Sequence, residues 1–350
     1  MGNKMKAAVL YGIGDIRYEQ VKIPQIKEEE ALVKVKVCGI CASDIPRVME
    51  KGTYHFPLIP GHEISGVVVQ KRKGNPGIKE GDRVTIFPLL PCYKCSYCQR
   101  GKYNLCDNYD YLGSRSDGGF AEYVKVPVKN LIKIPPMISY EEAALVEPSA
   151  VALHAINRVK VEINDSIAIL GVGFIGIVLA QWARIRGVRN IFLVDIKEEK
   201  LKVARQYSFE KIINAAKENP VEKILKESRG GVDISIEAAG VPTTFKQYLQ
   251  LTKKGGKVIL LGNMRGEVKL SENLISGILR KELTLYGSWN SVFTHFPKNE
   301  WETTLYFIKI GELKVKPLIT HHFKLKQVKK VFWMMHEGRE FFNKVIFVLD

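Results

Sequence analysis

Four cysteines lie close together in one short segment of this 350-residue chain. Cys92, Cys95, Cys98 and Cys106 follow the spacing C-x2-C-x2-C-x7-C. Four thiolates at this spacing can close around a zinc ion as a tetrahedral structural site. An iron–sulfur cluster is the alternative, but no Cys-Pro pair and no second cluster accompany the pattern. The segment of about residues 90–107 is therefore predicted to be a loop held by zinc, because it has few apolar residues of its own.

A second set of metal-binding residue types is dispersed along the sequence. Cys41 precedes the run Gly61-His62-Glu63, and Glu147 comes much later. A thiolate, an imidazole and a carboxylate that leave one position open form the donor set of a catalytic zinc. Taken singly, each residue has a plainer interpretation as a buried thiol, a core histidine or a surface charge. Either Glu63 or Glu147 can supply the carboxylate.

A glycine-rich run at mid-chain has the spacing that cradles a dinucleotide. Gly171, Gly173 and Gly176 form G-x-G-x-x-G directly after the apolar segment 167–170. The first glycine permits a tight turn, the second lets the backbone approach a pyrophosphate, and the third lets helix and strand pack closely. The pyrophosphate then lies at the N-terminus of the next helix. Alone the motif is weak, because glycines also mark ordinary turns.

An acidic residue in the expected place strengthens that motif. Asp195 ends the next apolar segment, and its carboxylate can accept hydrogen bonds from both ribose hydroxyls while it repels a 2′-phosphate. This favours NAD over NADP. Lys197 and Lys200 weaken the preference, because either side chain could pair with a phosphate.

Two patterns of secondary structure must position these residues. Up to about residue 150 the chain is rich in strands, such as 31–37, 64–70 and 83–86, which suggests an antiparallel, barrel-like unit. From residue 166 strands alternate with helices, which is typical of a doubly wound parallel sheet. We expect strands at 166–170, 190–194, 232–238, 257–261 and 283–287, helices at 175–186 and 198–207, and a last strand at 344–349 that rejoins the first domain. The predicted domains are 1–152 with 295–350, and 153–294.

Composition narrows the classes of function. Lys and Arg number 53 against 37 Asp and Glu, a formal net charge of +16 that attracts anions. The charge is spread along the chain, and no nucleic-acid-binding motif is recognisable, so a zinc-stapled nucleic-acid-binding protein is a distant alternative. The start of the chain has no signal-peptide pattern, and the longest apolar stretch, 167–180, is short for a membrane span. Clustered thiols then favour metal binding in the cytoplasm over disulfides.

Several motifs together resemble the zinc-containing medium-chain alcohol and polyol dehydrogenases. They are the segment 38–44, Gly-His-Glu-Ile-Ser-Gly at 61–66, the four-cysteine loop, Gly-Gly-Phe-Ala-Glu-Tyr at 118–123, Glu147-Pro148 and the glycine run. The segment 147–155 is similar to the sorbitol dehydrogenase branch, and the stretches 43–47, 287–290 and 300–303 to its galactitol-1-phosphate 5-dehydrogenases. The resemblance runs essentially from end to end. It implies an α/β fold with a Rossmann domain and a mostly β, GroES-like catalytic domain.

The resemblance also implies roles for individual residues. Cys41, His62 and Glu147 would hold the catalytic zinc, with Glu63 as a ligand or a close neighbour. Asp44 would fix the tautomer of His62, and Ser43 would relay a proton beside the zinc. Alcohol and sorbitol dehydrogenases commonly place a histidine after that serine, where this chain has Ile45 and Pro46, so the route by which the proton leaves is not predicted.

The implied reaction is oxidation of a secondary alcohol with hydride transfer to NAD. We expect two zinc ions per chain, a polyol phosphate as substrate with Arg47 at its phosphate, no nucleic-acid or membrane partner, and a homodimer or homotetramer. A free polyol or diol such as sorbitol, xylitol or 2,3-butanediol is the alternative substrate, and a zinc-free quinone reductase is a further alternative on the same fold. The cofactor-binding residues expected are Gly171, Gly173, Ile175, Gly176, Asp195, Lys200, Gly262 and Gly287.

Overall fold

The computed structural model describes residues 3–294 and 299–349. The chain divides into two compact units. Unit 1 comprises Met1–Ala150 with Val292–Asp350, and unit 2 comprises Val151–Ser291. The sequence predicted these junctions at 152/153 and 294/295, a few residues later, and residue 295 lies outside the described residues. Within the described residues no helix is long and apolar enough to cross a membrane.

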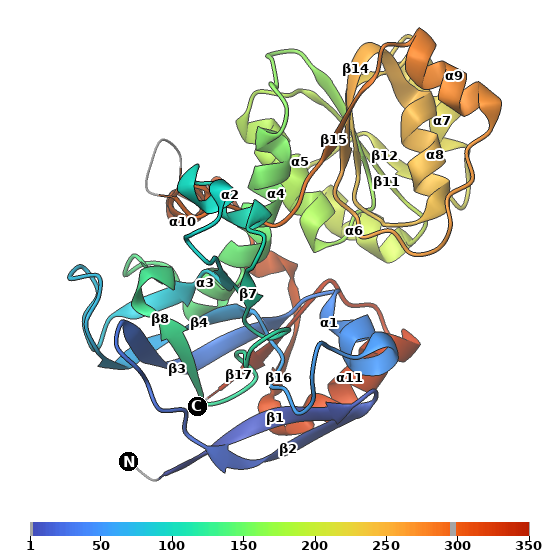
Figure 1. Cartoon of the computed structure of the whole chain (residues 1–350). Helices are drawn as coiled ribbons and strands as arrows, with labels where there is room; N and C mark the ends of the chain where they lie inside the picture. The colour runs from blue at the N-terminus through green and yellow to red at the C-terminus, as the bar shows by residue number, and fades with distance from the viewer. Residues whose placement is uncertain (1–2, 295–298, 350) are drawn as a thin grey trace. The chain divides into compact units, whose positions relative to one another are not determined.

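Unit 1 is built on a seven-stranded sheet in the order β16-β17-β3-β4-β5-β9, with β8 also paired to β3 (Figure 1). The long strand β3 is the central strand of this sheet, because it pairs antiparallel with β4, β8 and β17. The predicted return of the C-terminal strand to the first domain is therefore confirmed. The strands are β3 (Glu30–Ile40), β4 (Glu63–Lys71), β5 (Arg83–Ile86), β8 (Tyr123–Pro127), β9 (Leu131–Lys133), β16 (Ile319–Lys324) and β17 (Lys344–Val348).

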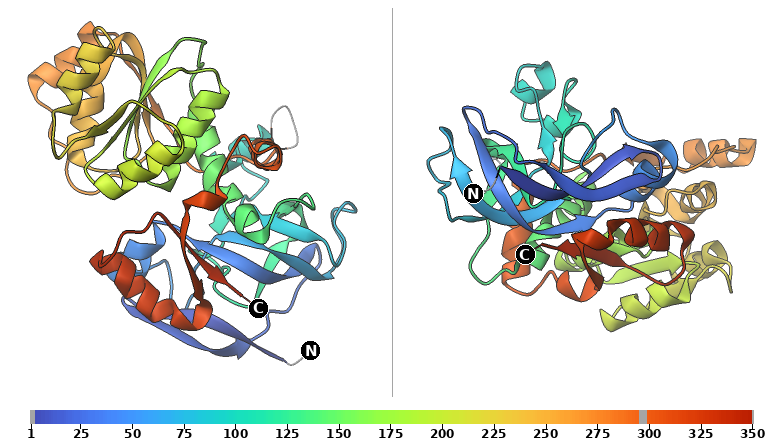
Figure 2. Two further views of the ribbon diagram at one scale, coloured as in Figure 1. Left: turned by 180° about the vertical axis from the view of Figure 1, so that it is seen from behind. Right: turned by 90° about the horizontal axis from the view of Figure 1, so that it is seen from below.

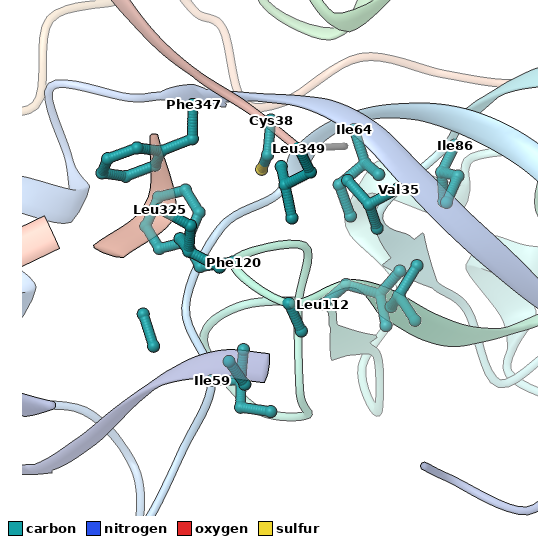
Figure 3. Packing of buried hydrophobic residues seen from close by; sticks show 14 of the residues in the cluster. Val35, Cys38, Ile59, Ile64, Ile86, Leu112, Phe120, Leu325, Phe347 and Leu349 are labelled. Atoms are coloured by element: carbon teal, nitrogen blue, oxygen red, sulfur yellow. The ribbon is translucent and has the colours of Figure 1, made fainter. Parts of the chain in front are cut away.

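A hydrophobic core joins this sheet to a hairpin of β1 (Lys4–Gly12) and β2 (Asp15–Lys22). Apolar and polar residues alternate over residues 33–37 of β3, where Val33, Val35 and Val37 are buried, whereas β17 is buried along most of its length. Phe120 lies at the centre, with its ring in edge-to-face contact with Phe347 at a centroid distance of 5.1 Å (Figure 3). Cys38 is fully buried in the same core, as expected for a small apolar side chain.

Short helices and strands complete unit 1. The cysteine loop lies between β6 (Leu89–Leu90) and β7 (Asp110–Tyr111), which pair with each other and so hold the two ends of the loop together. The helices are α1 (Asp44–Pro46), η1 (Arg47–Lys51), α2 (Ser96–Gln99), η2 (Tyr103–Leu105), η3 (Val128–Asn130), α3 (Tyr140–Ala144), α4 (Val146–Asn157), which continues into unit 2, α10 (Glu300–Lys309), η4 (Lys316–Leu318), η5 (Leu325–Gln327) and α11 (Val328–Glu337).

Unit 2 is a six-stranded parallel sheet in the order β12-β11-β10-β13-β14-β15. Helices cover both of its faces, α5 and α6 on one and α7, α8 and α9 on the other (Figures 1 and 2). This strand order is that of a dinucleotide-binding sheet. Its elements are β10 (Ser166–Leu170), α5 (Phe174–Ile185), β11 (Asn190–Asp195), α6 (Glu198–Gln206), β12 (Ile212–Asn214), α7 (Pro220–Glu227), β13 (Val232–Glu237), α8 (Pro242–Leu251), β14 (Thr252–Leu260), α9 (Glu272–Arg280) and β15 (Thr284–Gly287).

The predicted strands and helices of unit 2 agree closely with those observed. The largest difference is β14, which begins at Thr252 rather than at residue 257 because it includes the Lys-Lys-Gly-Gly stretch. Pairing with β13 sets Thr252 opposite Val232 and Lys257 opposite Ile234, so residues 253–256 form an irregular stretch between two paired positions, which local sequence does not mark as strand. The short strand β12 was not predicted, since three residues carry too little periodicity.

Candidate metal centres and dinucleotide site

The structure gathers the four loop cysteines into one cluster. The sulfur atoms of Cys92, Cys95, Cys98 and Cys106 all lie within 4.8 Å of one another. Cys92 Sγ is 4.0 Å from Cys98 Sγ, and Cys95 Sγ is 3.9 Å from Cys106 Sγ. Four sulfurs at Zn–S bonds of ~2.3 Å around a tetrahedral centre would stand about 3.8 Å apart. The cluster therefore fits a zinc ion and is too open for a disulfide.

The electrostatics of this cluster also call for a cation. Backbone N–H groups of Lys94 and Cys95 point at the sulfur of Cys92 and lower its pKa to about 6. Burial, together with the neighbouring thiols, raises the pKa of Cys98 to about 12. Sulfurs this close cannot all ionise unless a positive charge compensates them. A divalent ion at the centre would supply that charge.

Cys41, His62 and Glu63 form the second cluster, with one ligand atom from each within 4.8 Å of the others. Strand register brings them together: Glu63 begins β4 opposite Gly39 of β3, two residues before Cys41. Gly39 is required for this packing, because a Cβ there would stand 2.0 Å from Glu63 Oε2. One thiolate, one imidazole and one carboxylate make a donor set that suits zinc and leaves a position open for a small molecule.

Asp44 lies beside His62, and Ser43 lies beside Cys41. Asp44 is fully buried, and its Oδ1 lies 3.4 Å from Nδ1 of His62, which leaves Nε2 of the ring for a metal. Burial lowers the pKa of His62, but the Asp44 carboxylate and Cys41 outweigh burial and raise it well above its ordinary value. The Ser43 hydroxyl donates a hydrogen bond to Cys41 Sγ at 3.2 Å. The roles that the resemblance implies for Asp44 and Ser43 stay predictions.

Glu147 lies outside the cluster of Cys41, His62 and Glu63, although it is buried in the same region. It stands in the first turn of α4, and its Oε1 accepts a hydrogen bond from the Tyr111 hydroxyl at 3.2 Å. The Tyr111 ring meets the His62 ring edge-on at 5.6 Å. Burial raises the pKa of Glu147 to about 7. Sequence reasoning missed Tyr111, whose only signal was its place just beyond the cysteine loop.

Lys344 is a second residue that sequence reasoning missed. Its Nζ lies 2.7 and 2.9 Å from the two carboxylate oxygens of Glu63, and 3.3 Å from the carbonyl oxygen of Ile40. The pairing of β17 with β3 sets Val345 opposite Ile40 and so brings Lys344 to this place. Nothing local in the sequence marks a lysine 281 residues after Glu63 as its partner.

Arg47 has a partner within the same segment. Its Nη1 donates a hydrogen bond to Oδ1 of Asp44, and 20% of its side chain is exposed. The expected contact between Arg47 and a substrate phosphate stays a prediction.

The glycines of the nucleotide motif occupy three different environments. Gly171 has φ of +105°, and a Cβ there would stand 2.8 Å from the nitrogen of Ala239. No atom lies within 4 Å of a Cβ built on Gly173, so space is open beside this residue at the N-terminus of α5. A Cβ on Gly176 would stand 2.0 Å from the carbonyl oxygen of Gly171. The loop thus leaves an accessible, positively polarised helix end where a pyrophosphate could bind.

Asp195 ends β11 beside this loop. Its carboxylate accepts hydrogen bonds from the N–H groups of Val172 at 2.9 Å and Lys197 at 3.0 Å, and Lys200 Nζ is 3.4 Å away. Ile175 lies in the first turn of α5, while Gly287 ends β15. Gly262 comes after β14 and is closely packed, since a Cβ there would stand 2.4 Å from Oε2 of Glu237. These positions all belong to unit 2.

Both halves of the chain match family models. Residues 27–136 match the alcohol dehydrogenase GroES-like domain, and residues 175–309 match the zinc-binding dehydrogenase domain. The first match lies within unit 1, and the second runs from the first turn of α5 through β15 to the end of α10. The predicted fold class is therefore confirmed as a GroES-like unit joined to a Rossmann unit.

Whole-length relatives carry polyol names. The chain is 35% identical over 320 residues to galactitol 1-phosphate 5-dehydrogenase of Escherichia coli K12, covering 91% of this chain and 92% of the relative. It is 33% identical to sorbitol dehydrogenase of Bombyx mori, covering 95% of each. The crystal structure of galactitol-1-phosphate dehydrogenase from Escherichia coli superimposes with a TM-score of 0.92 at 32% identity, covering 99% of this chain and 100% of that one. With both domain matches, these show that the chain belongs to the zinc-containing medium-chain alcohol and polyol dehydrogenases.

Proposed function

We propose that this protein oxidises a secondary alcohol of a polyol phosphate and transfers the hydride to NAD. The observation that carries the proposal is the grouping of Cys41, His62 and Glu63 into an open donor set in a chain that also holds the glycine loop of a dinucleotide site. A zinc ion in such a set lowers the pKa of a bound alcohol, and a nicotinamide supplies the acceptor for the hydride.

The residues of unit 1 orient the alcohol and handle its proton. Ser43, which donates to Cys41 Sγ, would lie near a bound alcohol, and its oxygen could accept a hydrogen bond from the hydroxyl of that alcohol. We propose Glu63 as the carboxylate ligand, because Glu63 and not Glu147 groups with Cys41 and His62. Glu147 then acts from outside the ligand set, held by Tyr111. Zinc content should fall in Glu63→Gln and persist in Glu147→Gln, and the reverse result would exchange their roles.

The second proposed zinc is structural. The four-cysteine cluster offers no open position, so it contributes stability and not chemistry. We propose two zinc ions per chain. Thiols that serve as ligands also fit a reducing compartment such as the cytoplasm. Metal analysis of the purified protein should return about two zincs per chain.

We propose NAD as the preferred cofactor. Asp195 supports this preference, since a carboxylate at that position can accept hydrogen bonds from the ribose hydroxyls of NAD and repels the 2′-phosphate of NADP. Lys200, 3.4 Å from Asp195, acts against the preference, and a similar zinc-binding dehydrogenase from Sinorhizobium meliloti has been crystallised with NADP. The variant Asp195→Ala should lose NAD affinity and gain relative use of NADP. Wild-type preference for NADP would contradict the assignment.

The phosphate ester is supported by the relative from Escherichia coli K12 at 35% identity and by the net charge of +16. The decisive experiment measures NAD reduction with paired substrates, each polyol beside its phosphate: galactitol and galactitol 1-phosphate, sorbitol and sorbitol 6-phosphate. A higher kcat/KM for the esters supports the proposal. Equal or better oxidation of sorbitol, xylitol or 2,3-butanediol would favour a free polyol, which the sorbitol dehydrogenases at 33% and 32% identity also suggest.

We also propose a homo-oligomer. β15 is an edge strand of the parallel sheet and carries Leu285, which is 39% exposed, while Ile275 and Leu279 on the preceding helix α9 are 56% and 75% exposed. An exposed apolar sheet edge is a ready template for pairing with another chain. Sedimentation of Leu285→Lys against wild type tests whether this edge holds two copies together, and a monomeric wild type would contradict the proposal.

A further inference from the structure

One carboxylate of unit 1 is surrounded by three hydrogen-bonding or charged groups. Asp44 is completely buried, and its Oδ2 accepts a hydrogen bond from the Cys41 N–H at 3.0 Å. Its Oδ1 lies 3.4 Å from Nδ1 of His62, and the same oxygen accepts a hydrogen bond from Nη1 of Arg47. Asp44 therefore touches the segments that carry two candidate metal ligands and is anchored by one arginine.

Local geometry explains why Arg47 reaches Asp44. The two residues are three apart, Asp44 opens α1, and Arg47 opens η1 directly after Pro46. Side chains three residues apart lie on one face of a helix, so the guanidinium falls beside the carboxylate. Pro46 has φ of −65°, the value its ring imposes, and this stiffens the link between the two.

The charges show that this contact does more than hold a surface loop. A histidine that binds a metal is neutral, and its other nitrogen donates to a neighbouring acceptor. With the metal bound, His62 therefore brings no formal positive charge to Asp44. A guanidinium group, in contrast, is a permanent cation in proteins. Arg47 is thus the cation that compensates the buried carboxylate, which would otherwise be costly to bury.

We propose that Arg47 is a positioning residue of the metal centre: it holds Asp44, and Asp44 holds the His62 ring and the Cys41 backbone in place for the metal. The inference rests on the proposed catalytic zinc site. This role of Arg47 is the same for phosphorylated and free substrates. It therefore differs from the sequence-based prediction that Arg47 binds the substrate phosphate.

A double-mutant cycle on zinc affinity tests the proposal without any substrate. Arg47→Ala and Asp44→Asn should each weaken zinc binding about tenfold, as loss of a group that orients a ligand does. The double variant should be no weaker than Asp44→Asn, because Arg47 acts through Asp44. Competition with a chelator removes zinc from the two sites in separate phases and gives the affinity of each. The phase that is absent in Cys41→Ser belongs to the candidate catalytic site. Additive losses in the double variant would overturn the proposal.

A second readout separates positioning from general loss of stability. The visible absorption of the cobalt-substituted protein should change in Arg47→Ala and return in part in Arg47→Lys, which keeps the charge but not the planar fork. The matched control is Arg17→Ala, which breaks an exposed Arg17–Asp15 pair of the same chemistry and should alter neither readout.

The substrate panel supplies the last arm. Arg47→Ala should lower kcat/KM by the same factor for a polyol and for its phosphate. A loss confined to the phosphate, with unchanged zinc affinity and cobalt spectrum, would overturn the proposal and return Arg47 to the substrate. If no polyol of either kind is oxidised, the proposed function fails, while the zinc and cobalt measurements still decide the role of Arg47.

Discussion

The ammonium group of Lys344 lies 2.7 Å from Oε1 and 2.9 Å from Oε2 of Glu63, with the two side chains 5% and 0% exposed. A buried carboxylate in the candidate zinc centre thus has its own cation, delivered by the C-terminal strand β17. Burial alone lowers the pKa of Lys344, but Glu63 and Cys41 outweigh burial and raise it. The pair ties the end of the chain to the metal centre.

Removal of this cation should destabilise the protein. In the zinc-free protein, Lys344→Met nearly keeps the length of the side chain but leaves the charge of Glu63 buried and unpaired, at a cost of about 3–5 kcal/mol in the free energy of unfolding. Urea unfolding measures the change. Adding Glu63→Gln to Lys344→Met should recover a large part of it, because no lone charge then remains. A single variant as stable as wild type would show that the pair contributes nothing.

The two cysteine sites should fail in different ways. Cys95→Ser breaks the closed cluster and should lower both the melting temperature and the zinc content, since binding of structural zinc is coupled to folding. Cys41→Ser should abolish turnover with a much smaller change in melting temperature. The comparison needs metal analysis, thermal unfolding and activity on the same preparations. Normal kcat in Cys41→Ser would refute the catalytic assignment.

Two glycines of the nucleotide loop should separate folding from binding. Gly176→Ala forces a Cβ to within 2.0 Å of a carbonyl oxygen and should cost about 1–3 kcal/mol of stability, as overpacking does. Gly173→Ala meets no atom within 4 Å, so the free protein should keep its stability and lose affinity for NAD. Thermal unfolding with and without NAD distinguishes them. Equal loss of stability in both variants would contradict the assigned roles.

The stability of unit 2 should depend on pH through Glu198. Hydrogen bonds from Asn214, Arg205 and Lys217 lower the pKa of Glu198 to about 2. A carboxylate with a lowered pKa stabilises the folded state above its ordinary pKa, and this contribution is lost as pH falls toward the folded value. The melting-temperature advantage of wild type over Glu198→Gln should be constant from pH 7 to about pH 5 and shrink from about pH 4.5 toward pH 2. An advantage that grew in acid would refute this.

Motifs whose parts lie near one another in the sequence were predictable. The four cysteines fall within one loop, so their spacing alone nearly fixes how they meet. The glycine loop is equally local, because Gly171 to Gly176 joins one strand to the next helix. Short apolar segments that alternate with helical segments also predicted most strands of unit 2. In each case the physical constraint acts over a few residues of backbone.

Contacts between distant segments were decided only by the tertiary structure. Lys344 reaches Glu63 because β17 pairs with β3 in a register that no local pattern specifies. Tyr111 meets Glu147 because β6 and β7 pair, which places the end of the cysteine loop beside α4. The sequence by itself determined which residue types could bind zinc and a dinucleotide. Strand register decides which carboxylate lies beside Cys41 and His62, and which cation or hydroxyl pairs with each carboxylate. A shift by one residue would turn the side chains of a strand to the other face of the sheet.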